Sequence, residues 1–272
     1  GTRLKGVSFD VLLGAYLLDT NDLGTDMAAV AQQYGYTEIQ SDVSIYGKGA
    51  KRALPEDGVM FEHLARKIKV IKGLTNQLEE ALAEKNQDQL FHQMELPLSE
   101  VLAEMEIIGI TVDSERLEHM RVDFAKRLHD IETKIYEMAG ETFNLNSPKQ
   151  LGVILFEKMG LPVIKKTKTG YSTAVDVLEQ LREQAPIVDD ILIYRQISKI
   201  QSTYIEGLLK MIQADGRVHT RYVQTLTQTG RLSSVDPNLQ NIPIRLEEGR
   251  RIREAFVPKQ KDWLIYASDY SQ

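Results

Sequence analysis

The chain has 272 residues, a formal net charge of −6 at pH 7 and no cysteine. This length suits two or three modest domains, and the ordinary apolar and charged fractions favour a globular chain over a disordered one. Disulfides and thiolate metal sites are excluded by the lack of cysteine. No run approaches the roughly 18 consecutive apolar residues of a membrane helix, and the N-terminus lacks a secretory pattern. We therefore expect a soluble protein of the cytoplasm that contacts no membrane.

Charge is distributed unevenly along this acidic chain. Residues 195 to 253 contain ten basic and five acidic side chains, a local balance of +5 that leaves −11 for the rest. Such clustering is what a nucleic-acid-binding role requires when the whole chain is acidic. A second basic cluster, Lys165, Lys166 and Lys168, lies upstream beside Gly170 and Ser172. On sequence alone, a solvated loop is the commoner origin of that cluster.

The first 109 residues are predicted to be mainly helical. Residues 26–34 read as a short helix closed by Gly35, and Pro55 opens a longer helix. The apolar stripe of the longer helix includes Phe61, Leu64, Ile68 and Ile71. The polar residues 84–89 separate this region from a second helical pattern that ends near Gly109, so we expect a domain boundary around residue 85.

A long helix is predicted from an N-cap at Asp113 or Ser114 to Gly140. Its apolar residues recur every three or four positions, close to the period of a coiled-coil seam: Leu117, Met120, Phe124, Leu128, Ile131, Ile135 and Met138. The same spacing returns within residues 193–211, which favours antiparallel pairing of the two helices. Between them, Ser147-Pro148 begins a helix to about Lys158, and residues 165–172 form a loop.

The pattern changes after the turn at residues 214–216. Val218, Thr220 and Tyr222 alternate with polar residues, as in a strand. Residues 249–256 can form a helical turn or two, and the apolar run 263–267 predicts a buried strand. The fold class is therefore α+β, with long antiparallel helices followed by antiparallel strands.

Asp269 follows the predicted strand 263–267 directly. A carboxylate on such a rigid mount can bind Mg²⁺, which prefers hard oxygen ligands. Taken alone, an aspartate in this position is more often a turn or cap residue. The five histidines are scattered without the spacing of a zinc site, so we assign them no metal.

Residues 229–243 crowd hydrogen-bond donors into one irregular stretch. Arg231, Asn238, Gln240 and Asn241 lie there, between strand-like segments. Arginine and amide side chains can donate to purine N3 and pyrimidine O2, which every base pair presents in the minor groove. By itself such a stretch is more often a polar surface loop.

Residues 229–243, followed by Arg245, 247–253 and 268–272, resemble the signature of the family A DNA polymerases of the bacterial polymerase I type, up to their motif A. Residues 143–151, 167–173 and 194–204 also resemble that family. The resemblance covers residues 95–272, and residues 7–90 more loosely.

The resemblance implies a fragment of a DNA-directed DNA polymerase of replication and repair. Its partners would be primer-template DNA and dNTP, and it would act as a monomer in the bacterial cytoplasm, associated with the nucleoid. Asp269 would be catalytic, binding a Mg²⁺ pair together with the Tyr270 carbonyl. The second carboxylate of the family follows motif A, so we expect the isolated 272 residues to be inactive.

The resemblance also implies roles for the donors. Arg245 would lie near the incoming nucleotide or the template-primer junction, and Arg231, Asn238, Gln240 and Asn241 near the minor groove. Arg195, Lys199 and Thr229 would support the DNA backbone. The loop at the tip of the thumb, which includes Lys165, Lys166, Lys168 and Ser172, would meet duplex phosphates.

Three domains follow from this resemblance: 1–84, part of an exonuclease-like domain; 85–214, a thumb that grips duplex DNA; and 215–272, the start of the palm with motif A. Proofreading members begin the helix after Pro55 with a tyrosine and, four positions later, a metal-binding aspartate. This sequence has Met60 and Leu64 there. We therefore expect no 3′–5′ exonuclease activity.

Two other classes of protein compete with a polymerase. A non-catalytic module could grip duplex DNA without extending it. A helical structural protein could carry the basic stretch as solvated surface, but this hypothesis does not explain why donors crowd the segment that precedes Asp269.

Overall fold

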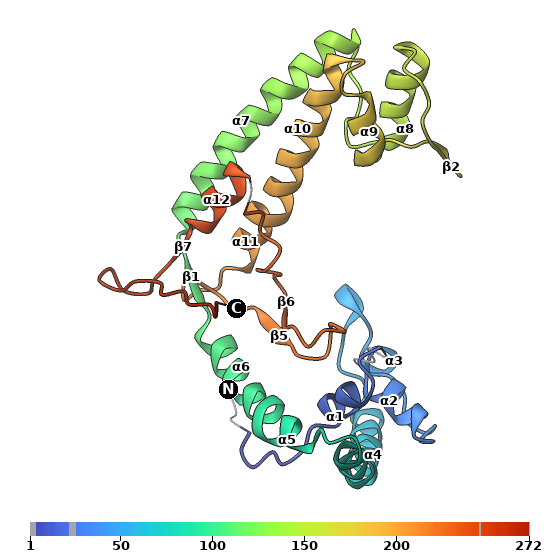
Figure 1. Cartoon of the computed structure of the whole chain (residues 1–272), viewed down its shortest axis with the longest axis vertical. Coiled ribbons are helices and arrows are strands. Elements are labelled where there is room, and N and C mark those ends of the chain that lie inside the picture. The colour runs from blue at the N-terminus through green and yellow to red at the C-terminus, as the bar shows by residue number, and fades with distance from the viewer. Residues whose placement is uncertain (1–3, 22–25, 245, 272) are drawn as a thin grey trace. The chain divides into compact units, whose positions relative to one another are not determined.

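The computed structural model describes residues 4–21, 26–244 and 246–271. Contacts divide the chain into two compact units, Gly1–Gly109 with Thr220–Gln240, and Ile110–His219 with Asn241–Gln272. Figure 1 shows long helices with a few short strands, which confirms the α+β class. In the part of the chain that the structure describes, none of the helices is both long and apolar enough to cross a bilayer.

The first unit is built around the long helix α4. Its other helical segments are short, and a small hairpin completes it. The elements are α1 (Val11–Leu18), α2 (Met27–Gln33), α3 (Asp42–Tyr46), the 3₁₀ turn η1 (Gly49–Lys51), α4 (Asp57–Glu84), α5 (Asp88–Leu90), the π-helical η2 (Phe91–Glu95), α6 (Leu96–Ile108), β5 (Arg221–Val223) and β6 (Ser233–Val235).

The predicted helix after Pro55 is confirmed as α4, but its core-facing side differs from the predicted stripe. Phe61 and Ile68 are 61% and 66% exposed, whereas Leu74 and Leu78 are fully buried against α1 and α2. Both sides of α4 carry apolar residues at helical spacing, so periodicity alone does not decide which side meets the core.

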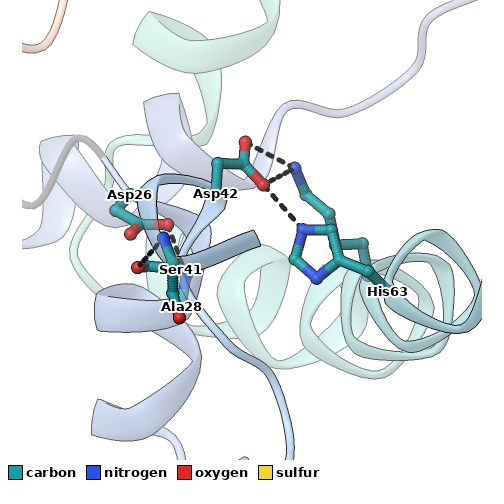
Figure 2. A network of polar contacts seen from close by, with 7 residues as sticks. Asp26, Ala28, Ser41, Asp42 and His63 are labelled. Carbon is teal, nitrogen blue, oxygen red and sulfur yellow. Dashed lines mark hydrogen bonds and ion pairs between the residues drawn. The ribbon is translucent and has the colours of Figure 1, made fainter. Parts of the chain in front are cut away.

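One polar cluster joins α4 to the start of α3, and only its histidine is buried. His63 is 3% exposed, and its Nε2 lies 2.7 Å from Asp42 Oδ1. Figure 2 shows the Asp42 carboxylate facing the His63 ring. Lys67 donates to the same carboxylate at 2.8 Å. Burial alone would raise the pKa of Asp42, but the hydrogen bonds from Lys67 and His63 outweigh it and hold that pKa below its ordinary value.

The second unit is a pair of long helices with a sheet at one end. Its elements are β1 (Ile110–Val112), α7 (Ser114–Ala139), α8 (Pro148–Gly152), the π-helical η3 (Val153–Lys158), β2 (Lys166–Thr167), β3 (Gly170–Tyr171), α9 (Val175–Leu181), α10 (Pro186–Ile200), the π-helical η4 (Gln201–Ile205), α11 (Glu206–Met211), β4 (Arg217–Val218), α12 (Glu247–Arg253) and β7 (Phe256–Val257).

Helices α7 and α10 pack side by side and run in opposite directions, as predicted (Figure 1). Asp113 caps α7 by accepting from Arg116 N at 3.0 Å, and Gly140 ends it with a φ of 74°. The buried seam includes Ile135 of α7 with Ile187 and Ile191 of α10. Burying an isoleucine side chain contributes roughly 1.5–3 kcal/mol, so this seam is the main support of the unit.

The antiparallel sheet β4-β1-β7 joins the start of α7 to the end of α12. Ile110 pairs with Val218, and Val112 with Phe256. The single strand predicted around Val218, Thr220 and Tyr222 is in fact two, because the chain leaves β4 for the separate β5–β6 hairpin. Thr220 does not continue the first sheet, and its hydroxyl hydrogen-bonds to Val235 O and Pro237 O beside the hairpin.

The prediction of a buried strand at residues 263–267 is wrong. The segment has no regular structure, and Leu264 and Tyr266 are 90% and 88% exposed. An apolar run becomes a strand only where a neighbouring strand accepts its backbone hydrogen bonds. Within the described residues, no strand pairs with this segment. Asp269 consequently follows an extended, exposed tail.

We expect Asp42→Asn to lower the free energy of unfolding at pH 7 by roughly 1 kcal/mol, because the half-exposed carboxylate loses its charge opposite Lys67 and solvent screens the pair. The folded pKa is depressed, so the contribution is present above the ordinary value of 3.8 and is lost as the pH falls below it. Urea unfolding of the variant and the wild type as a function of pH measures the difference between their free energies of unfolding.

Glu80→Gln, an exposed change on the same α4, is the control and should stay within roughly 0.5 kcal/mol of the wild type. A gap for Asp42→Asn that persisted undiminished at pH 3 would contradict the assigned charge interaction.

Candidate nucleic-acid interface

The loop of the β5–β6 hairpin carries the start of the donor-rich stretch, residues 229–243. Tyr222 pairs with Ser234 across the hairpin, and the connecting loop leaves Thr229 and Arg231 exposed. The Thr227 hydroxyl donates to Arg231 O at 2.8 Å, which closes the loop. The backbone of Arg231 is therefore fixed while its guanidinium lies at the surface.

Two helices of the same unit hold this hairpin. The hydroxyl of the buried Tyr16, in α1, donates to Thr227 O at 2.6 Å. Glu106 Oε1, in α6, accepts from Tyr222 N at 2.7 Å. Sequence reasoning missed both supports, since Tyr16 fits an apolar stripe and Glu106 a solvated face. The available signal was chemical: a buried tyrosine needs a partner for its hydroxyl.

Asn238 and Gln240 follow β6 in a turn that uses their oxygen atoms. Asn238 Oδ1 accepts from Gln240 N at 3.0 Å, and Gln240 Oε1 accepts from Ser234 N at 3.3 Å. The buried Ser234 hydroxyl accepts from Leu239 N at 2.9 Å. Both amide side chains are exposed, and their NH₂ groups are the parts with donor capacity.

The remaining donors belong to the second unit. Asn241 is exposed, and its carbonyl accepts from the Tyr204 hydroxyl at 2.5 Å. Arg245, predicted to lie near the incoming nucleotide, is outside the described residues.

The predicted loop at residues 165–172 contains a small hairpin of β2 and β3, in which Lys166 pairs with Tyr171. Three lysines of the hairpin region are exposed: Lys165, Lys166 and Lys168. Ser172, also predicted to meet phosphates, is only 6% exposed, and its hydroxyl accepts from Ala174 N at 3.4 Å. The lysines are thus placed at the surface, whereas Ser172 faces the turn.

Arg195 and Lys199 lie one turn apart on α10 but differ in their surroundings. Lys199 is exposed. The guanidinium of Arg195 donates to the carbonyl of Thr173 and, at 3.1 Å, to its hydroxyl. Burial lowers the pKa of Arg195. Arg195 therefore fastens the segment that follows the lysine hairpin.

Asp269 and Tyr270 are exposed, and Asp269 Oδ1 accepts from Tyr270 N at 2.9 Å. Across the described residues, no group of three or more His, Asp or Glu side chains could hold a metal ion. The residues present therefore do not fit a Mg²⁺ pair by themselves, because one carboxylate and one carbonyl leave most ligand positions unfilled.

The comparison with protein families agrees with the resemblance. The model of DNA polymerase family A matches residues 114–272, more than half of the chain. This chain belongs to the family A DNA polymerases. A second model, the ribonuclease H-like domain of DNA polymerase I, matches residues 1–74.

Curated relatives cover the chain from end to end. DNA polymerase I of Bacillus subtilis is 59% identical over 100% of this family A chain, and that of Geobacillus stearothermophilus is 56% identical, also over 100%. The chain spans 31% of the length of each relative.

A solved structure shares the fold. It is the POL domain of Pol1 from M. smegmatis in complex with DNA primer-template and dNTP, 38% identical, with a TM-score of 0.79. The match covers 93% of this chain and 42% of that one.

We expect Arg195→Ala to lower the free energy of unfolding by roughly 1.5–3 kcal/mol, because Thr173 loses a charged donor in a half-buried position. Lys199→Ala, on the same helix, should change it by less than roughly 0.5 kcal/mol. Urea unfolding followed by circular dichroism compares the two variants. Equal destabilisation would contradict the different roles assigned to these two cations.

Proposed function

We propose that this chain grips primer-template DNA as part of a DNA-directed DNA polymerase of replication and repair. The observation that carries the proposal is the set of exposed donors at Arg231, Asn238, Gln240 and Asn241. Hydrogen bonds hold the carbonyls of Arg231 and Asn241, and the side-chain oxygen of Asn238 accepts from Gln240 N. Donors fixed in this way can test base-pair shape in the minor groove without reading sequence. The solved relative bound to primer-template and dNTP supports it.

Other positions would contact the sugar-phosphate backbone. Lys199 and Thr229 are exposed and suited to it, as are the lysines 165, 166 and 168. We infer that Arg195 and Ser172 act indirectly, by shaping the segment between the lysine hairpin and α9. Arg245 is proposed as the residue near the nucleotide on resemblance alone.

Asp269 is our candidate for a catalytic carboxylate, with the Tyr270 carbonyl as a further Mg²⁺ ligand. The single candidate carboxylate supports the proposal that these 272 residues alone do not extend a primer, and that the remaining ligands come from outside them. We keep the division into an exonuclease-like part (1–84), a thumb (85–214) and the start of a palm (215–272) as a proposal.

The exonuclease-like part is proposed to lack 3′–5′ exonuclease activity, since Met60 and Leu64 occupy the positions of the tyrosine and aspartate of proofreading members. We further propose a monomer acting on nucleoid DNA in the bacterial cytoplasm, in keeping with the bacterial relatives. Release of 3′ nucleotides from single-stranded DNA in Mg²⁺, or a dimer in sedimentation, would refute the respective proposal.

The binding proposal is tested by fluorescence anisotropy with a recessed primer-template, a blunt duplex and a single strand, across a salt series. We expect preference for the primer-template and a log–log salt slope that reflects several phosphate contacts. Arg231→Ala should weaken binding roughly tenfold, whereas Arg52→Ala, an exposed change outside the donor-rich stretch, should weaken it less than roughly twofold.

No binding at low salt by a chain that circular dichroism shows to be folded would refute the DNA grip. The same samples, given dNTP and Mg²⁺, distinguish the polymerase fragment from a fully competent enzyme: we expect no extension. Extension would refute the assignment of missing ligands. A non-catalytic duplex-binding module, the second candidate, predicts no preference for the recessed end over the blunt duplex.

A further inference from the structure

Residues 241–244, here called the anchored segment, have no regular secondary structure. They join the donor-rich stretch to α12 and carry the exposed side chain of Asn241. A segment of this kind is positioned only if other elements hold its backbone. Three residues of the same unit do so.

The first contact comes from the helical side. The Tyr204 hydroxyl donates to Asn241 O at 2.5 Å. Tyr204 lies in the π-helical turn η4, which interrupts the continuous helix between α10 and α11. Such turns insert one residue into the helical repeat and occur frequently at functional sites. The hydroxyl meets the backbone of Asn241 and leaves its amide side chain exposed.

The second and third contacts come from α12. A Cβ on Gly249 would lie 1.9 Å from Pro243 O and 2.7 Å from Pro243 C, so only glycine permits this approach of backbone to helix. Beside it, Arg250 Nε donates to Ile244 O at 3.3 Å. The anchored segment thus meets α12 through a close approach of its backbone at Gly249 and a side-chain hydrogen bond from Arg250.

Helix α12 is itself fixed on α7. Glu248, 8% exposed, accepts from Arg127 at 2.5 Å. Arg251 donates to Asp123 at 3.0 Å and lies over the Phe124 ring, 5.5 Å from its centroid. A charged pair with one buried partner and a cation–π contact both resist sliding of the short helix.

We propose that Tyr204, Gly249 and Arg250 are positioning residues that set the place of Asn241, and of the residues beside it, against primer-template DNA. This inference rests on the proposed function and adds to it three residues that touch no DNA. They act through the backbone of the anchored segment. Removing them lowers affinity without removing a phosphate contact.

The test uses the 272-residue chain and two matched pairs of variants. Tyr204→Phe removes only the hydroxyl. Its control is Tyr136→Phe, on α7, where the lost hydroxyl lies 2.6 Å from Phe143 O and 2.9 Å from Glu132 Oε1. Gly249→Ala forces Pro243 aside, whereas at Gly207 the nearest atom to an added Cβ is 3.8 Å away. Gly207→Ala is therefore its control.

We expect the Kd for the recessed primer-template to rise about three- to tenfold in Tyr204→Phe and by at least that in Gly249→Ala, with the salt slope unchanged. Tyr136→Phe and Gly207→Ala should bind within about twofold of the wild type. In an Asn241→Ala background, Tyr204→Phe should cost less than it does alone, because coupled residues are not additive. A merely structural role would lower the melting temperature without this coupling.

Hydrogen exchange separates the two possible failures. Faster exchange of the Ile242 and Ile244 amides in Tyr204→Phe, but not in Tyr136→Phe, supports the anchoring even without DNA. If the wild type shows no preference for primer-template, the proposed function fails. If the wild type binds and both Tyr204→Phe and Gly249→Ala match it in affinity, the positioning inference is overturned while the function stands; should Gly249→Ala not fold, Tyr204→Phe decides.

Discussion

The donor-rich stretch is held by side-chain hydrogen bonds that engage backbone groups and amide oxygens, and these bonds do not use the guanidinium of Arg231 or the NH₂ groups of Asn238 and Gln240. Nearly every buried or constrained backbone group in a protein needs a partner. Three of the partners are hydroxyl groups that donate to carbonyls: Tyr16 to Thr227 O, Thr220 to Pro237 O at 2.7 Å, and Tyr204 to Asn241 O. An irregular segment becomes a defined surface in this way.

The long helices supply the frame for that surface in the second unit. The seam between α7 and α10 is packed with apolar side chains, and an ion pair from Lys134 to the buried Asp190 also joins the two helices. Helix α10 leads into the turn that carries Tyr204, and α7 fixes α12 through charged side chains. Apolar packing thus positions α7 against α10. Polar contacts then position the anchored segment against these helices.

Regular periodicity made the helical frame predictable from sequence. The α7 seam, the Asp113 cap and the end at Gly140 all follow from local chemistry. Residues 263–267 show the limit, since an apolar run carries no information on whether a neighbouring strand exists. The choice between the two apolar sides of α4 failed for a similar reason, because it depends on tertiary contacts with α1 and α2.

The donors of the candidate site were found by their crowding in the sequence, and the structure places them at the surface, except for Arg245, which is outside the described residues. Their supports were not found, since Tyr204, Tyr16 and Gly249 contact backbone atoms that no sequence pattern encodes. Arg195 and Ser172 show the converse: both have the chemistry of a phosphate ligand, but the fold directs them to Thr173 and Ala174.

The central claim, that residues 229–241 meet primer-template DNA, is tested most directly by photo-cross-linking. A primer-template carrying an aryl azide on a guanine N2 near the recessed end, which places the reactive group in the minor groove, is irradiated with the bound chain, and cross-linked peptides are identified by mass spectrometry. We expect cross-links within residues 229–241. Cross-links confined to other segments of a folded, DNA-bound chain would contradict the account.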